Sequence, residues 1–151
     1  MSVFEQLWFT PDDTDPARVA RVLAARLDMT LTVDGAHVIV SGGHDDGFGG
    51  PVGGAVDVND YTAMERKVEP EDFAIFDDVP MIWQLWAPVE TEEEQQAAAR
   101  AVFDRLAERL EWPAILTHDF DTLIATYDPR RGVREFPPGT LSDARHRHLW
   151  A

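Results

Sequence analysis

Residues 91–117 read TEEEQQAAARAVFDRLAERLEWPAILT and decide the fold class. Thr91 and Glu94 have the spacing of a capping box, which predicts that a helix begins here. Apolar side chains then recur at helical spacing as far as Leu110, and Trp112-Pro113 ends the pattern. An apolar stripe of this kind has to pack on another layer, and the strand-like residues 114–117 follow directly. The stretch therefore predicts a helix that lies on a β-sheet.

The rest of the chain supplies the partners of this helix. Asp15-Pro16 is a helix start signal and predicts a second helix over residues 16–28. Asp34-Gly35 between two apolar runs is typical of a hairpin with a two-residue type I′ turn. Strands are predicted at 3–9, 29–33, 38–40, 81–87, 114–117 and 122–127, with a short candidate at 55–58. These elements predict an α+β two-layer sandwich, in which an antiparallel or mixed sheet of five to six strands carries two main helices on one face.

Two segments lack helical or strand periodicity. Residues 41–54, SGGHDDGFGGPVGG, are rich in glycine and predict a loop. From about residue 129 onward the chain is locally basic and poorly patterned. A length of 151 residues suits one independent core, so we expect residues 1–151 to form a single domain.

The net charge of −15 limits the classes of partner. A field of this sign repels phosphate backbones and anionic lipids, so we expect binding neither to nucleic acid nor to membranes, whereas a basic protein would be attracted. The chain has no cysteine, which excludes disulfides and thiolate sites. Residues 1–8 have no basic segment and only a short apolar run, so no signal peptide is predicted and a cytoplasmic location is expected.

The acidic side chains are concentrated between Asp57 and Glu94, where aromatic residues lie among them. Aromatic anchors surrounded by acidic groups suit a docking face for a basic protein. Trp83 and Trp86 are three apart on a predicted strand, so their side chains should point to opposite faces. The competing interpretation is a solvated acidic face with both tryptophans covered. The candidate partner-binding residues are Glu65, Glu69, Glu71, Asp72, Phe73, Phe76, Asp77, Asp78, Trp83 and Trp86.

Catalytic motifs are weak in this sequence. The glycine-rich loop contains no lysine and carries Asp45 and Asp46 where a phosphate would sit, which argues against nucleotide binding. No serine lies in a nucleophile elbow. The turns at 44–46 and 118–121 contain His and Asp residues, which would suffice for one divalent metal if they converged. Because convergence cannot be read from spacing, we predict no cofactor, metal ligand or catalytic residue.

These observations predict an acidic protein-binding or inhibitor module. Its most specific form is an immunity protein, or antitoxin, that neutralises a cognate toxin by stoichiometric binding. Small size, acidity and missing catalytic motifs resemble such inhibitors in general properties only. The alternatives are a small metal-dependent hydrolase using His44, Asp45, His118 and Asp119, and a non-catalytic subunit or adaptor of a larger assembly.

Overall fold

The computed structural model describes residues 4–43, 47–48, 50–60 and 74–151. The strands are β1 Glu5–Phe9, β2 Thr30–Asp34, β3 His37–Gly42, β4 Val52–Val58, β5 Met81–Leu85, β6 Ala114–His118, β7 Thr122–Asp128 and β8 Gly132–Glu135. The helices are α1 Pro16–Leu27, α3 Glu92–Arg109 and the short α4 Arg147–Trp150, which follows a 3-10 turn at Ala144–His146. The α+β class is confirmed.

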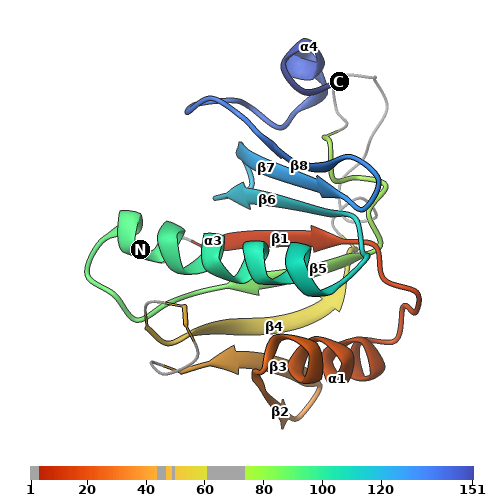
Figure 1. The fold of residues 1–151 in the computed structure, drawn as a ribbon, viewed down its shortest axis with the longest axis vertical. Helices are drawn as coiled ribbons and strands as arrows, with labels where there is room; N and C mark the ends of the chain where they lie inside the picture. Colours follow the sequence, from red (N-terminus) through yellow and green to blue (C-terminus); the bar gives the residue numbers. More distant parts are fainter. Residues whose placement is uncertain (1–3, 44–46, 49, 61–73) are drawn as a thin grey trace.

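All eight strands belong to one antiparallel sheet in the order β2-β3-β4-β5-β1-β6-β7-β8. The prediction of five to six strands was therefore too low. The two long helices, α1 and α3, contact each other and lie over one face of the sheet (Figure 1). Their residues form the main core with the side chains that strands β1, β3, β4, β5 and β6 direct toward that face.

Both long helices begin where their caps predict. The Asp15 carboxylate accepts a hydrogen bond from the Arg18 amide at 3.0 Å, and Pro16 is the first helical residue. The Thr91 hydroxyl oxygen accepts from the Glu94 amide at 3.1 Å. The Glu94 carboxylate then accepts from the Thr91 hydroxyl, so the box closes through the side chain of Thr91. These caps fix the ends of the two helices that cover the sheet.

Central strand β1 is buried on both sides of the sheet. Leu7 and Phe9 point into the main core beneath the helices, whereas Trp8 points to the opposite side. We call the side without α1 and α3 the second face. There Trp8 and Ile82 pack with Phe76, which belongs to the segment that leads into β5.

The predicted hairpin is present, with its turn shifted by one residue. Asp34 pairs with His37, so the two turn residues are Gly35 and Ala36 rather than Asp34 and Gly35. Of these two residues only Gly35 has a positive φ, at 59°. A single positive φ at the first position belongs to a type II′ turn, so the type I′ prediction was wrong.

The glycine-rich loop is shorter than the predicted 41–54. β3 continues to Gly42 and β4 begins at Val52, because Gly53 and Gly54 take part in the sheet. A Cβ atom on Gly54 would lie 1.6 Å from the Gln84 carbonyl oxygen. These two glycines therefore permit close strand packing, a use that composition cannot distinguish from a loop.

The basic segment after residue 129 is also more regular than predicted. β8 pairs with β7, and Asp128 opposes Gly132 across the turn. All four residues of β8 are exposed. Since neither face of this short edge strand is buried, its sequence lacks the apolar alternation that identifies a strand.

Candidate protein-docking surface

The ten candidate partner-binding residues divide into two equal groups. Five of them, Glu65, Glu69, Glu71, Asp72 and Phe73, lie outside the described residues. The other five are described and occupy different environments. They are Phe76, Asp77, Asp78, Trp83 and Trp86.

Trp83 and Phe76 are buried within the protein itself. Trp83 is completely buried in the main core, and its indole Nε1 donates to the Gly54 carbonyl at 3.1 Å. Phe76 stacks on Trp8 across the second face, with ring centroids 3.9 Å apart and planes 4° from parallel. Both rings therefore contribute to the stability of the fold and have almost no free surface to offer a partner.

The two aspartates beside Phe76 also differ. A carboxylate oxygen of Asp77 accepts a hydrogen bond from the Ala74 amide at 2.7 Å, which stabilises the turn that carries Phe76. Asp78 is exposed. Of this pair, Asp78 is the side chain that can act on a partner without disturbing the turn.

Trp86 is an exposed aromatic side chain on a fixed backbone. Its backbone amide and carbonyl pair with Gly53 through hydrogen bonds of 2.9 and 3.1 Å. Its side chain is 46% exposed. The ring thus stands at the end of β5 on the face opposite Trp83, as their spacing predicts. A large aromatic ring held in this way suits a binding hot spot.

An apolar groove of about 650 Å³ adjoins Trp86 on the second face. Its floor is the Gly53–Ala55 part of β4 together with Gln84 of β5. Ile39 of β3 and Phe4, which precedes β1, line it from either side. Pro51 and Pro88 complete its rim. Segments that are distant in the sequence therefore build one continuous apolar surface.

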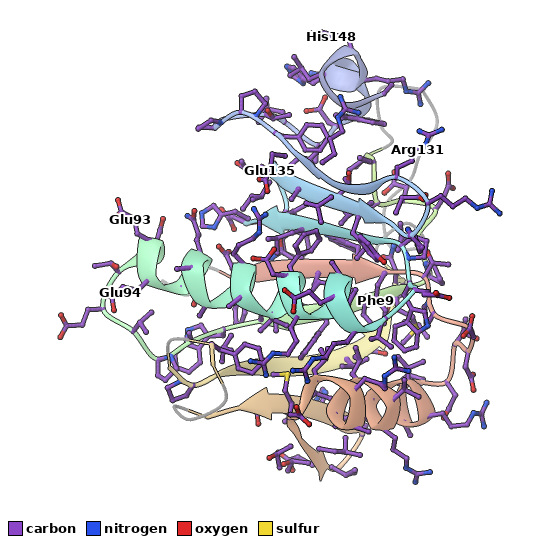
Figure 2. All side chains as sticks on the ribbon, in the orientation of Figure 1. Phe9, Glu93, Glu94, Arg131, Glu135 and His148 are labelled. Atoms are coloured by element: carbon purple, nitrogen blue, oxygen red, sulfur yellow. The ribbon has the colours of Figure 1, made fainter. Side chains whose placement is uncertain are left out.

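No basic residue other than histidine belongs to the strands around this groove. Residues 27–65 and 68–99 contain neither lysine nor arginine, and they include β2 to β5 in full. Asp57, Asp78 and Glu90 are exposed there, and the first turn of α3 is acidic. Figure 2 shows Glu93 and Glu94 at the N-terminal end of α3, well away from Arg131 and His148. These described acids therefore lie apart from the basic residues of the C-terminal segment.

The described part of the glycine-rich loop packs on the helical side. Phe48 is buried in the main core, and the Arg105 guanidinium lies 3.9 Å from its ring centroid. Arg105 also donates to the Leu27 carbonyl at 3.0 Å. Phe48 thus packs against Arg105, which links the two long helices, and its side chain does not project from the protein.

The buried Glu5 of β1 and the partly buried His118 of β6 form a polar pair. His118 Nδ1 lies 2.7 Å from a Glu5 carboxylate oxygen, and its Nε2 lies 3.7 Å from Glu92. Burial raises the pKa of the Glu5 carboxyl above its ordinary value, while the contact with His118 opposes that rise. Glu5 was not a candidate in the sequence, where it is one polar residue within an apolar run.

The metal-site interpretation gains no support from the described residues. Within residues 4–43, 47–48, 50–60 and 74–151, no three His, Asp or Glu side chains are grouped as metal ligands. His44, Asp45 and Asp46 lie outside these ranges, whereas His118 is engaged by Glu5.

No protein-family model, curated protein or solved structure matches this chain. Among the described helices, none combines the length and apolar character needed to cross a bilayer.

Proposed function

We propose that this chain is a stoichiometric binding module for a basic protein, and that its most specific role is that of an immunity protein which neutralises a toxin. The observation that carries the proposal is the half-exposed Trp86 beside an apolar groove, whose strands β3 to β5 contain no lysine or arginine. An aromatic anchor next to an apolar surface supplies affinity, and acidic groups around it favour a basic partner.

The energetic roles of these groups differ. Burial of the exposed part of Trp86 and the groove removes apolar area from water, which stabilises the complex and slows dissociation. Asp57, Asp78 and Glu90 are exposed, so they contribute mainly to the rate of association and to partner choice. Binding should therefore weaken as salt rises and retain an apolar component at high salt.

Affinity capture from the native cytosol tests the proposal, with native mass spectrometry of the complex. We expect one basic protein at a 1:1 ratio, with much stronger capture at about 50 mM than at about 500 mM salt. If the partner is a toxin, its activity should fall in proportion to the amount of complex. Absence of any stoichiometric partner at either salt would contradict the proposed function.

Two variants with the same added charge separate the groove from the rest of the surface. Ala55→Arg places a cation on the groove floor, whereas Val133→Arg places one on exposed edge strand β8. We expect Ala55→Arg to lose capture and Val133→Arg to retain it, provided that circular dichroism shows both variants folded. Equal capture by the two variants would exclude the groove as the docking surface.

A further inference from the structure

The second face of the sheet is covered over one part and uncovered over another. Around Trp8, the rings of Phe76 and Phe120 pack on it, the latter edge-on with centroids 5.9 Å apart. Over β3, β4 and β5 the groove remains, and Trp86 is half exposed there. A sheet normally buries its apolar face against another layer, and among residues 4–43, 47–48, 50–60 and 74–151 no element covers this region.

The strands that form the groove already have hydrogen-bonded neighbours on both sides. β3 pairs with β2 and β4, β4 pairs with β3 and β5, and β5 pairs with β4 and β1. A partner strand cannot add to strands that have neighbours on both sides, which excludes β-augmentation at this site. Recognition therefore depends on side chains that pack down onto the face.

The dimensions of the groove fit one helix. Ile39 lies on β3 and Phe4 directly precedes β1, and the sheet order places β4 and β5 between them. Three inter-strand spacings amount to roughly 14 Å. A helix with its side chains is about 10–12 Å across. One helix can therefore lie over Ala55 and Gln84, with Ile39 and Phe4 on its flanks and Trp86 at one end.

The acidic residues near the groove favour basic residues on the outer surface of such a helix. Asp57 is exposed and lies two residues beyond Ala55 on the same face of β4, and exposed Glu90 follows Pro88 of the rim by two residues. These acids, and the neighbouring strands without lysine or arginine, favour a helix with basic residues beside its apolar stripe. A second copy of this chain, with its net charge of −15, would bring like charges together. The groove therefore suits a different, basic protein better than self-association.

The described residues on either side of positions 61–73 lie at the other end of β4 and β5. The backbone amide of Asn59 donates a hydrogen bond to the Pro80 carbonyl at 2.7 Å, and its side-chain amide donates to the carbonyls of Phe76 and Val79. The groove instead adjoins Val52 and Trp86, at the start of β4 and just beyond the end of β5. Both attachment points of 61–73 are therefore remote from it.

From these observations we infer that the basic partner contributes one amphipathic helix, which packs its apolar stripe into the groove of Phe4, Ile39, Ala55 and Trp86 and directs basic residues toward Asp57 and Glu90. This inference rests on the proposed function and adds the kind of element that is recognised. The partner helix would form a third layer over β3 to β5, opposite α1 and α3.

Photo-cross-linking in the full-length chain tests this inference. A benzophenone amino acid at position 55 reports on the groove floor, and the same group at Val133 is the control on β8. Each variant is first tested for folding and for capture of the basic partner found with the unmodified chain. The cross-linked peptides are then identified by mass spectrometry.

We expect the probe at position 55 to label partner residues that are three or four positions apart, within a segment that also contains lysine or arginine. The probe at position 133 should leave the partner unlabelled. Labelling of every second partner residue would indicate an extended segment and overturn the helix. Labelling of residues 61–73 of this chain, or of a second copy, would overturn the partner as the occupant.

The two proposals fail in different ways. If the complex forms with the unmodified chain but the probe at position 55 does not label the partner, the groove inference is wrong and the binding function stands. If no stoichiometric complex forms, the proposed function is wrong and the inference falls with it.

Discussion

Trp83 and Trp86 lie three residues apart and point to opposite faces of the sheet, the first completely buried and the second 46% exposed. This difference predicts that Trp83 supports the stability of the fold and that Trp86 is available for binding. Trp83→Ala should lower the free energy of unfolding by about 3–5 kcal/mol, because it leaves a cavity in the main core. Trp86→Ala should lower it by about 1 kcal/mol or less. Urea unfolding measures both values, and equal losses would contradict this assignment.

Phe76 should behave as a structural residue although it lies within the acidic segment. Phe76→Ala removes the ring that stacks on Trp8 at 3.9 Å, and we expect a loss of about 3 kcal/mol in the free energy of unfolding. Phe76→Leu keeps most of the apolar volume and should lose less. Partner affinity per folded molecule should stay the same in both variants. A large fall in affinity without loss of stability would instead make Phe76 a contact residue.

Three exposed acids from the segments without lysine or arginine should govern the rate of association. A triple variant with Asp57, Asp78 and Glu90 replaced by lysine should bind the partner with an association rate lower by about tenfold or more at low salt. The matched control replaces Asp12, Glu108 and Glu111 by lysine. These three acids are exposed and line a different groove, beside α1 and α3. Both variants change the net charge equally. Equal effects in stopped-flow measurements would show that only total charge matters.

The buried Glu5 gives the stability a defined dependence on pH. Because burial raises the pKa of Glu5 above 4.5 in the folded protein, the folded state keeps this proton where the unfolded chain has released it. The contribution of Glu5 to stability is therefore present below pH 4.5 and is lost as the pH rises through the folded-state pKa. The other charged or titratable groups that act on it are His118, Glu92 and Asp119.

Replacement by glutamine removes this titration. The free energy of unfolding of Glu5→Gln relative to the wild type should therefore increase as the pH rises above 4.5. Glu92→Gln is the control, since it removes an exposed carboxylate from the same histidine. Urea unfolding at several pH values between about 4 and 7 provides the measurement. A difference between Glu5→Gln and the wild type that stays constant or falls with pH would contradict the burial argument.

The sequence was informative where local interactions decide the structure. The cap at Thr91 and the stripe ending near Leu110 predicted α3, because capping and helical periodicity act within a few residues. The hairpin near Gly35 was found for the same reason. Its turn was displaced by one residue, since register depends on the pairing of Asp34 with His37 and not on turn composition alone.

Features that depend on distant contacts were missed or only partly found. Gly53 and Gly54 belong to a glycine-rich stretch, which is typical of a loop. They lie in β4, where the neighbouring strands approach too closely for a side chain. The groove could not be predicted, since Phe4, Ile39 and Ala55 come together only when the sheet forms. The spacing of Trp83 and Trp86 was the one local signal for this surface. It placed the two rings on opposite faces without showing which of them is exposed.

Our proposal assigns Trp86 as the anchor for a basic partner on the second face. Its most direct test is the dissociation constant of the purified complex, measured by calorimetry for the wild type, Trp86→Ala and the control Val133→Ala. Loss of a hot-spot tryptophan costs about 2 kcal/mol or more, so we predict roughly 30-fold weaker binding for Trp86→Ala. Val133→Ala should bind like the wild type. A dissociation constant for Trp86→Ala within about twofold of the wild type would contradict the claim.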